Sequence, residues 1–524
     1  MAVDGKPHTR TRPTPRVISQ VIRRSARMPC ILFSTATCLG AVLRDALAHL
    51  MSSSMELTLV NLSNDGILCG RRTSNANVQV SVALQPSEAT STRIPSHCSE
   101  DGITLALLAL GEKAQKWTIE HEHLVTRAST IAMPSWRSID VSDDCPWRVY
   151  CRKIRRHHRI LYLFPRRSTA GFLSDMHDGC PLSSLLLPGT HDSMAFYGWP
   201  VAQCQSIDTP LSVQLESGIR VLDIRLALVM DRLIAYHGIT PQRTPFQDIL
   251  TTMHAFLTAP ASCRETLVVS IKQEDFATTP APKFSAAVHA EMLSGPGGKE
   301  MWYLENRIPR LGEVRGKAVL FSRFGGNSDG WDGGLEGLGI HPTTWPDSAR
   351  DGFSWNCKET LVRTHDWYSI PSFLSIPEKV VRATENLLPP DEPAPMPILN
   401  VSFFSASSFP LAAPPTIAQG FGWPKYGLGV EGVNSRVGRW LLDKLGQTVQ
   451  AMQRDEDPSD EEFEEKAPKK PAMAEDEMYV VNVDAEPRIR GWAFTDYYAR
   501  PEASLVALMI ECNYRGRKEG EEGW

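Results

Sequence analysis

Two histidines and an arginine follow apolar runs in the middle of the chain, each close to a carboxylate. His191 and Asp192 lie in PGTHDS, Asp223 and Arg225 in LDIR, and His237 in AYHG. Histidine titrates near neutral pH, so two histidines can serve as general base and general acid. The planar guanidinium of an arginine can bind a phosphate, and a carboxylate beside a histidine fixes its tautomer. This set of residues suits in-line attack on a phosphodiester.

Charged and polar residues also lie at the ends of later apolar runs. A single histidine at such a position is more often structural than catalytic. Charges at the ends of many strands are harder to explain as packing, because a buried charge is costly unless it is paired or used. They therefore indicate a functional site. The further members are Lys272 and Glu274 in ETLVVSIKQE, Arg323 in KAVLFSRF, Asp366 and Tyr368 in LVRTHDWY, and Asp496 in WAFTDYY.

We expect neither a metal ion nor another cofactor at this site. A metal ion is the usual alternative to histidines in phosphodiester cleavage. Here Arg225 occupies the strand position where a further carboxylate ligand would be expected. The 11 cysteines stand singly, without a CxxC motif or a cysteine–histidine cluster at zinc spacing. A structural zinc site and a disulfide scaffold are therefore both disfavoured.

These residues must be positioned by segments that alternate between strand and helix. In a parallel barrel the carboxyl ends of the strands converge on one face, where active sites are built. We therefore predict an α/β fold, a TIM-like (β/α) barrel; the alternative is a doubly wound open sheet, which no GxGxxG turn supports. The expected strands are 183–191, 220–229, 233–238, 265–274, 316–324, 359–368, 397–407 and 490–498, and the expected helices are 209–219, 246–259, 283–293, 376–388, 433–445 and 504–513.

The chain before the barrel has two parts of different composition. Residues 1–54 form a basic leader that we expect to be disordered, since residues 1–44 hold eight Lys and Arg but a single acid. A non-native extension or surface helix, a secretory signal and an organelle transit sequence all remain open for this leader. Residues 55–165 alternate apolar and polar residues and predict a small β-rich N-terminal domain.

The order of these motifs resembles the phosphatidylinositol-specific phospholipase C X domain. The segment LLLPGTHDS…QLESGIRVLDIRL…AYHG…FQDILTTMHAFL…ETLVVSIKQE is similar to the metal-independent bacterial and fungal branch of these phospholipase C-like phosphodiesterases. The resemblance covers roughly residues 180–515 and is strongest over 183–325. The β-rich segment from Met55 resembles the N-terminal domain of fungal members.

The resemblance implies a role for each matched residue. His191 would be the general base that takes the proton of the inositol 2-hydroxyl, and His237 the general acid that protonates the leaving glyceride oxygen. Arg225 would neutralise the phosphate, in the place that calcium takes in the animal signalling enzymes. The supporting carboxylates would be Asp192 and Asp223, and the inositol ring would contact Lys272, Arg323, Asp366 and Tyr368.

The family also places a late carboxylate against the base histidine, and two residues of this chain could supply it. Asp496 follows a Gly-Trp pair on an apolar strand and is favoured over Glu431 in GLGVEGVN. With Asp496 on the last strand, the barrel spans 175–515 and carries an insertion at about 453–487. This insertion includes the acidic run DEDPSDEEFEE. The alternative is a disordered tail after about residue 450.

The implied activity is that of a phosphoric diester hydrolase, which cleaves phosphatidylinositol-type lipids to diacylglycerol and inositol cyclic phosphate. One alternative is a catalytically weak barrel that binds lipid headgroups. Another is a metal-dependent glycerophosphodiesterase, which would need Glu-x-Asp after the first histidine, where this chain has LDIR.

The implied partner is a phosphoinositide or related lipid at a membrane surface. The net charge of −5 argues against nucleic acid, and we expect a monomer. Since no apolar run reaches about 18 residues, we expect peripheral contact and no transmembrane helix, in either a cytoplasmic or a secreted protein. The loop MAFYGWPVAQ, with Phe196, Tyr197, Trp199 and Pro200, either dips into lipid or packs against the barrel.

Overall fold

The computed structural model describes most of the chain from residue 54 onward. The described residues are 54–72, 78–95, 102–108, 115–120, 135–155, 157–325, 338–390, 395–408, 410, 412–423, 428–455, 486–501, 503–517, 520 and 522. The predicted basic leader, apart from Ser54, lies outside the described residues, and so does most of the predicted acidic insertion.

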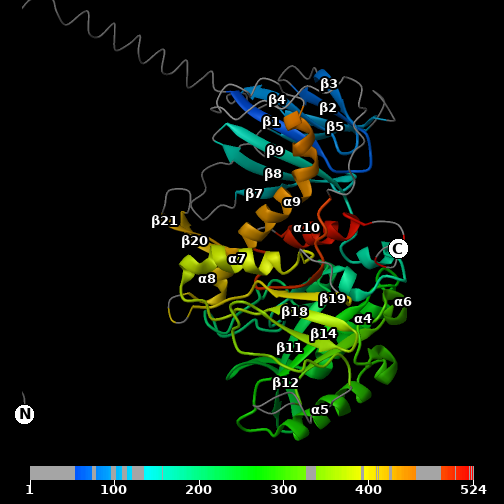
Figure 1. The fold of residues 1–524 in the computed structure, drawn as a ribbon, viewed down its shortest axis with the longest axis vertical. Helices are drawn as coiled ribbons and strands as arrows, with labels where there is room; N and C mark the ends of the chain where they lie inside the picture. Colours follow the sequence, from blue (N-terminus) through cyan, green and yellow to red (C-terminus); the bar gives the residue numbers. More distant parts are fainter. Residues whose placement is uncertain are drawn as a thin grey trace, which may run out of the picture. The chain divides into compact units, whose positions relative to one another are not determined.

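The main sheet has 11 strands, and seven of them form its parallel centre (Figure 1). Neighbouring strands run in parallel in the order β16, β14, β11, β10, β22, β19 and β18. The last strand in sequence, β22, is thus inserted between β10 and β19. This curled sheet with helices between its strands confirms the TIM-like (β/α) barrel. The strands are β10 (Leu186–Thr190), β11 (Val221–Val229), β14 (Leu267–Gln273), β16 (Ala318–Arg323), β18 (Thr360–His365), β19 (Ile398–Phe403) and β22 (Gly491–Thr495).

The barrel sheet ends in two short edge strands rather than in a continuous ladder from β16 to β18. The strand β15 (Trp302–Tyr303) pairs with β16, and β17 (Phe353–Cys357) runs antiparallel to β18. Aromatic side chains fill the interior: the Phe321 ring lies 6.1 Å from the Trp355 ring and 5.9 Å from the Trp345 and Trp492 rings. Packing of large rings therefore joins strands between which the described residues form no backbone hydrogen bond.

Helices cover the barrel strands, and the apolar spacing of α4 shows why. Its buried residues repeat at three- and four-residue intervals and so face the sheet; they are Phe246, Ile249, Leu250, Met253, Phe256 and Leu257. Burying one such side chain stabilises the fold by about 1.5–3 kcal/mol. All six expected helices are confirmed. The helices are α3 (Leu211–Glu216), α4 (Phe246–Thr258), α5 (Ala281–Ser294), α6 (Leu311–Val314), α7 (Ile376–Glu385), α8 (Pro414–Gln419), α9 (Val433–Asp455) and α10 (Leu505–Glu511).

The strand predicted over 233–238 is present, but it is not a barrel strand. As β12 (Arg232–His237) it folds back antiparallel on β11 and pairs with β13 (Thr240–Pro245). The turn between β11 and β12 spans only Met230 and Asp231, both with positive φ. A connection of two residues allows a hairpin but is too short for a parallel crossover. His237 therefore reaches the site at the end of a strand that runs back along the carboxyl-terminal half of β11.

Residues 54–165 form two antiparallel-rich sheets, as the β-rich prediction requires. One sheet has the order β4, β1, β9, β8, β7, and the other has the order β3, β2, β5, β6. Their facing apolar side chains, among them Leu57, Ile103, Leu105, Trp147 and Leu161, form one core. The strands are β1 (Ser54–Asn61), β2 (Ile67–Arg72), β3 (Val78–Leu84), β4 (Ala89–Pro95), β5 (Gly102–Leu107), β6 (Trp117–Glu120), β7 (Trp136–Ile139), β8 (Trp147–Arg155) and β9 (His158–Pro165); a hairpin of β20 (Gly420–Trp423) and β21 (Leu428–Glu431) precedes α9.

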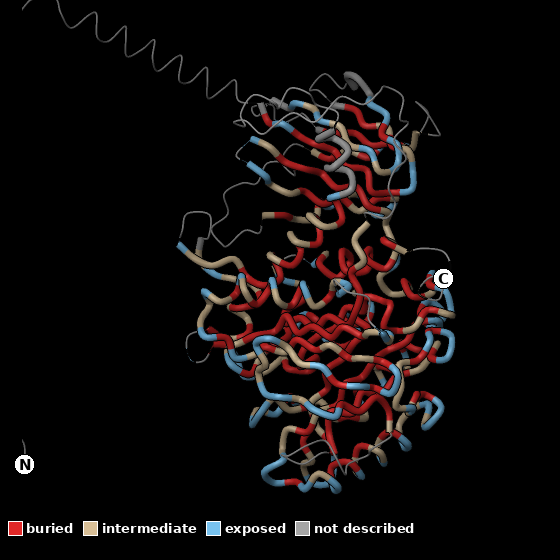
Figure 2. The backbone as a smooth tube through the Cα atoms, viewed as in Figure 1, coloured by how far each residue is buried: buried red, intermediate tan, exposed pale blue. Residues whose placement is uncertain are grey.

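The β-rich segment shares a second core with helices α9 and α10. Trp136 donates its indole N–H to the carbonyl of Ser435 at 2.8 Å. Gly438 of α9 faces the same indole so closely that a Cβ atom at this position would overlap the ring. Buried backbone continues through both sheets and the barrel strands (Figure 2). The β-rich segment is therefore packed on the barrel helices and is not a freely tethered module.

Candidate active site

His191 and Asp496 are neighbours because the first and last barrel strands pair. In the β10–β22 register, Thr190 lies opposite Thr495, which places the next residue of each strand at the same carboxyl edge. The Nδ1 atom of His191 lies 2.8 Å from Oδ1 of Asp496. Gln205 donates to the carbonyls of both His191 and Thr495, at 2.9 and 3.0 Å, and so fixes the strand ends.

Arg225 sets the protonation state of His191. Its Nη2 lies 2.6 Å from Nε2 of His191, and a guanidinium can only donate. Nε2 must therefore offer its lone pair, while Nδ1–H donates to Asp496. Burial, together with the positive charge of Arg225, holds the pKa of His191 well below its usual value. His191 is thus a neutral imidazole whose lone pair points at a cation, as a general base requires.

Asp192 and His237 form a second pair. The backbone of Asp192 is left-handed, with φ of 43°, and its N–H donates to Oδ2 of Asp223 at 3.1 Å. Aspartate tolerates this conformation, which turns the side chain towards His237. Nδ1 of His237 donates to the carbonyl of Ala202 at 2.8 Å and lies 3.4 Å from Oδ2 of Asp192. Burial raises the pKa of Asp192 to about 6.

Three cations lie side by side across three barrel strands. The strand registers place Arg225 opposite Lys272 and Lys272 opposite Arg323. Asp223 accepts from Arg225 at 3.1 Å and from Arg323 at 3.3 Å, and Glu274 lies 3.5 Å from Arg225 and 3.2 Å from Lys272. Burial alone would raise the pKa of both carboxyls, but the neighbouring cations outweigh it and lower both.

Asp366 and Tyr368 follow the end of β18 and lie on the far side of His191. The Tyr368 ring is 5.3 Å from the His191 ring. Asp366 accepts the indole N–H of Trp345 at 3.0 Å, and the guanidinium of Arg323 lies 4.0 Å from the centre of the Trp345 ring. Tyr368 thus borders the base directly, whereas Asp366 joins the cluster through Trp345 and Arg323.

Side-chain exposure separates the groups that can meet a substrate from those that support them. Lys272, His237 and Arg225 are 26%, 16% and 11% exposed, whereas Asp192 and Asp496 are each 1% exposed. The accessible face of the cluster is therefore cationic, with carboxylates behind it. Such a face suits an anionic group held between a base and an acid.

The structure also decides which late carboxylate lies near the base. Glu431 accepts from Ser435 at 2.6 Å and pairs with Arg439 at 3.0 Å, so its carboxylate is engaged at the start of α9. It is Asp496 that contacts His191. The role assigned to Asp496 from the sequence stays a prediction, and the geometry agrees with it.

Several residues of the cluster were not assigned a role from the sequence. Glu274 was noted at a strand end, but its link to Arg225, Lys272 and the N–H of Gly238 depends on the register of β14 and on the hairpin. Gln205 carries no sequence signal, because its partners are backbone carbonyls. Cys204 lies 3.8 Å from Nδ1 of His237, and a lone cysteine in sequence does not predict such a contact.

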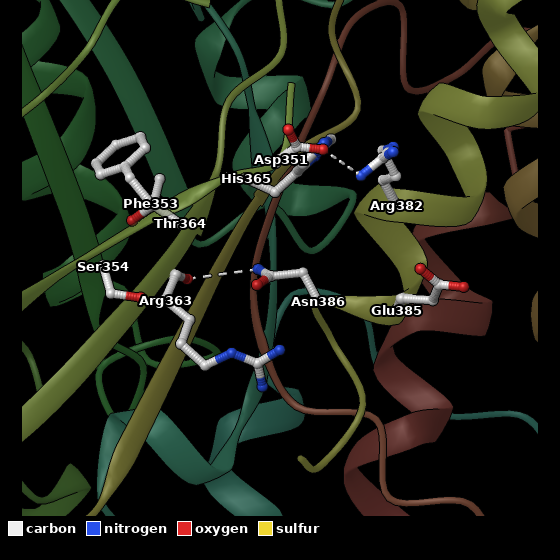
Figure 3. A pocket seen from close by; sticks show the side chains of 10 residues that line it. Asp351, Phe353, Ser354, Arg363, Thr364, His365, Arg382, Glu385 and Asn386 are labelled. Carbon is white, nitrogen blue, oxygen red and sulfur yellow. Dashed lines mark hydrogen bonds and ion pairs between the residues drawn. The ribbon is translucent and has the colours of Figure 1, made fainter. Parts of the chain in front are cut away.

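A separate polar pocket lies between β18 and α7 and contains none of the predicted site residues. Its volume is about 280 Å³. Figure 3 shows Asp351 paired with Arg382 and the carbonyl of Arg363 bonded to Asn386. His365 projects from the same face of β18 as Arg363. Since Thr364 between them bonds Trp355 on the interior side, this pocket lies outside the barrel and is distinct from the histidine cluster.

Comparison of the sequence with known proteins finds relatives over part of the chain, although no family model matches it. It is 28% identical over 228 residues to 1-phosphatidylinositol phosphodiesterase of Staphylococcus aureus (strain Newman), covering 42% of this chain and 70% of that protein. It is 32% identical over 168 residues to the protein of the same name from Listeria monocytogenes, covering 30% of this chain and 49% of that protein. The match to the Listeria protein thus spans about half of its length.

Comparison with solved structures finds phosphatidylinositol-specific phospholipases C of the same two species. Phosphatidylinositol-specific phospholipase C of S. aureus aligns with a TM-score of 0.44 and 20% identity, over 66% of this chain and 98% of that structure. The enzyme of L. monocytogenes aligns with a TM-score of 0.41 and 22% identity, over 66% of this chain and 99% of that structure. These scores are too low to define the fold, which the strand order defines by itself. The sequence relatives confirm the resemblance: over up to 42% of its length, this chain is similar to bacterial 1-phosphatidylinositol phosphodiesterases.

Proposed function

We propose that this protein is a phosphatidylinositol-specific phospholipase C that uses two histidines and an arginine and requires no metal ion for the chemical step. One observation carries the proposal: Nε2 of His191 presents a lone pair beside Arg225, and His237 lies across the same cluster on Asp192. A base, a fixed cation and an acid thus surround one location.

His191 starts the reaction by accepting the proton of the inositol 2-hydroxyl at Nε2. In the free enzyme this nitrogen accepts from Arg225, so substrate binding must move the guanidinium from the histidine to the phosphate oxygens. Asp496 then faces an imidazolium and stabilises its new charge through the Nδ1 hydrogen bond. The 2-hydroxyl oxygen attacks phosphorus in line with the glyceride oxygen.

His237 completes the step by protonating the leaving glyceride oxygen. Asp192, 1% exposed and 3.4 Å from Nδ1, stabilises the protonated ring before transfer. The products are diacylglycerol and inositol 1,2-cyclic phosphate. The proton gained by His191 and the one lost by His237 are exchanged with water, which restores both rings.

The inositol ring would be bound by the row of three cations, Arg225, Lys272 and Arg323, and by the residues that follow β18. Lys272 is the most exposed cation of the row, and Arg323 is held between Asp223 and the Trp345 ring. Asp366 and Tyr368 would complete the headgroup site from the opposite side. Hydroxyls of a polyol are well matched by this mixture of donors and carboxylate acceptors.

Exposed apolar side chains around His237 would contact the lipid surface. Trp199 is 75% exposed, Ile207 60% and Ile239 98%, and all three lie on loops that pack together. Tyr197 N–H donates to Gln242 at 2.8 Å, which joins the loop after β10 to the β12–β13 hairpin. Tryptophan and aliphatic side chains favour the membrane interface. Among the described helices, none has the length and apolar character needed to cross a bilayer.

The test is release of inositol cyclic phosphate from phosphatidylinositol micelles with chelator present. The proposal predicts release by the wild-type protein and none above background by His191→Ala. Binding to phosphatidylinositol vesicles without release by either protein would instead support a headgroup-binding barrel. Release that disappears with chelator and returns with calcium would support metal-dependent cleavage.

A further inference from the structure

We propose that Asp192, Cys204 and His237 form a binding site for zinc, and that zinc bound there inhibits the enzyme. The site joins a thiol, an imidazole and a carboxylate that the sequence spacing does not connect. The inhibition rests on the proposed function, whereas the binding does not.

The loop after β10 brings Cys204 behind His237. This loop leaves the barrel at Asp192 and returns so that the N–H of Cys204 donates to the carbonyl of Ala195 at 3.0 Å. Tyr497, just after β22, donates its N–H to the carbonyl of Cys204 at 2.9 Å. Cys204 is fully buried. Its Sγ atom is therefore fixed by backbone contacts on both sides rather than placed by a mobile loop.

The distances among the three ligand atoms fit tetrahedral zinc. Sγ of Cys204 lies 3.8 Å from Nδ1 of His237, and Oδ2 of Asp192 lies 3.4 Å from the same nitrogen. All three atoms lie within 4.8 Å of one another. With Zn–S of about 2.3 Å and Zn–N and Zn–O of about 2.0–2.2 Å, tetrahedral ligands stand roughly 3.3–3.6 Å apart. Shifts of a few tenths of an ångström at His237 and of up to about an ångström between Cys204 and Asp192 would complete the geometry.

Asp192 supplies an independent sign of a ligand position. Its side chain is 1% exposed, and neither carboxylate oxygen accepts a hydrogen bond from the described residues. Its nearest polar contacts are ion pairs at 3.4 Å to His237 and 3.5 Å to Arg225. A buried carboxylate is normally hydrogen-bonded, so these oxygens have unused acceptor capacity directed at Cys204 and His237.

The charge around the site can accommodate a cation. Four carboxylates form ion pairs with the histidines and cations of the cluster, against three side-chain cations, so this ion-paired set has one more acid than base. Ligation by a thiolate adds a further negative charge. The carboxylates are Asp192, Asp223, Glu274 and Asp496, and the cations are Arg225, Lys272 and Arg323.

The donor set selects a thiophilic metal. Sulfur and imidazole favour zinc, whereas magnesium and calcium prefer oxygen ligands. Cys204 also lies near His191 and Asp496. Both ring nitrogens of His191 are already hydrogen-bonded, to Asp496 and Arg225. The set of His191, Cys204 and Asp496 is therefore less available to bind a metal ion than the set that contains His237.

Binding would remove the general acid. Zinc replaces the thiol proton of Cys204 and the Nδ1 proton of His237, which then loses its hydrogen bond to Ala202. The metal-bound ring keeps a single proton, on Nε2, and can no longer act as an imidazolium. Asp192 is withdrawn from the ring at the same time. Leaving-group protonation therefore fails until the metal is removed.

Direct binding tests the site without any lipid. Equilibrium dialysis of the full chain with zinc should show one ion bound to the wild type and none at this site in Cys204→Ala. Cobalt, used as a zinc substitute, should give a thiolate-to-cobalt charge-transfer band in the wild type alone. Cys263→Ser is the matched control, because Cys263 is the one exposed thiol among the described cysteines; this variant should bind zinc like the wild type.

Activity tests the inhibition separately. Stoichiometric zinc should lower phosphatidylinositol turnover at least tenfold in the wild type and in Cys263→Ser, and chelator should restore it. Cys204→Ala should keep whatever turnover it has without zinc when zinc is added. Equal zinc binding by Cys204→Ala, or absence of the cobalt band in the wild type, would overturn the site. A protein that binds zinc through Cys204 but cleaves no lipid would refute the proposed function and leave the site standing.

Discussion

Replacing Asp496 by asparagine removes the carboxylate beside the base His191 and leaves the shape of the replaced side chain almost unchanged. Oδ1 of Asp496 lies 2.8 Å from Nδ1 of His191, and both side chains are nearly inaccessible. Burial raises the pKa of Asp496, but the positive charge that His191 gains in the transition state favours the carboxylate form, which stabilises that charge. Two unit charges about 4 Å apart attract by about 4 kcal/mol at an effective dielectric of 20. Loss of that attraction corresponds to roughly a thousandfold fall in rate.

A second effect acts in the same direction. The amide of asparagine can donate to Nδ1, which would place the histidine proton on Nε2 and block the base. We therefore expect Asp496→Asn to lower kcat by 10² to 10³ or more, with KM changed less than threefold. The assay is initial-rate release of inositol cyclic phosphate from mixed micelles over a range of lipid concentrations.

Glu431→Gln is the matched control, since it also converts a late carboxylate to an amide but leaves His191 untouched. It should retain nearly full kcat, and both variants should melt within a few degrees of the wild type. If Asp496→Asn keeps more than a third of wild-type kcat, or if Glu431→Gln loses more activity than Asp496→Asn, the assignment of Asp496 to the base is refuted.

Four further predictions concern charge, pH and packing. Arg225→Ala should lower kcat at least 10²-fold in the micelle assay, because a preplaced donor is typically worth about 3–4 kcal/mol; unchanged kcat would contradict its role at the phosphate. The kcat/KM profile should fall below pH about 6 as Asp192 is protonated, and a profile flat to pH 5 would contradict this. Because burial raises the pKa of Asp192 above its unfolded value, its contribution to stability is present below pH about 4 and lost as the pH rises through 6. At pH 8 the free energy of unfolding of Asp192→Asn should therefore exceed that of the wild type by up to about 3 kcal/mol, as measured by denaturant titration, although the variant is less active. A variant less stable than the wild type would contradict this. Gly438→Ala should destabilise the fold by about 1–3 kcal/mol in thermal denaturation, since its Cβ would overlap the Trp136 ring, and an unchanged melting temperature would show that the β-rich segment does not pack there.

The barrel could be predicted from the sequence because its local signals agree with one another. Apolar runs at strand positions alternate with helices such as α4, whose buried residues keep the helical period. The polar residues that end β10, β11 and β14 lie at the carboxyl edge, where the barrel rule places them. The expected strand containing His237 was assigned to the barrel by the same reasoning, and the two-residue turn at Met230 and Asp231 makes it a hairpin instead.

Contacts between residues far apart in the chain could not be predicted in the same way. The pairing of β10 with β22 joins His191 to Asp496 across 305 residues, and the sequence alone left Glu431 as a candidate. Glu274 reaches its partners because of the register of β14, and Gln205 contacts backbone carbonyls. Neither kind of contact can be predicted from residue type. Similarly, the need for glycine at position 438 in α9 becomes clear only from the packing of Trp136 against it.

The central claim is that His191 acts as a base without a metal ion. The most direct measurement is release of inositol 1,2-cyclic phosphate from phosphatidylinositol in excess chelator, by the wild type and by His191→Ala at equal concentration. The geometry predicts steady release by the wild type and a loss of at least 10³-fold in the variant. Equal release by both proteins, or release by the wild type only after a metal ion is added, would contradict the claim.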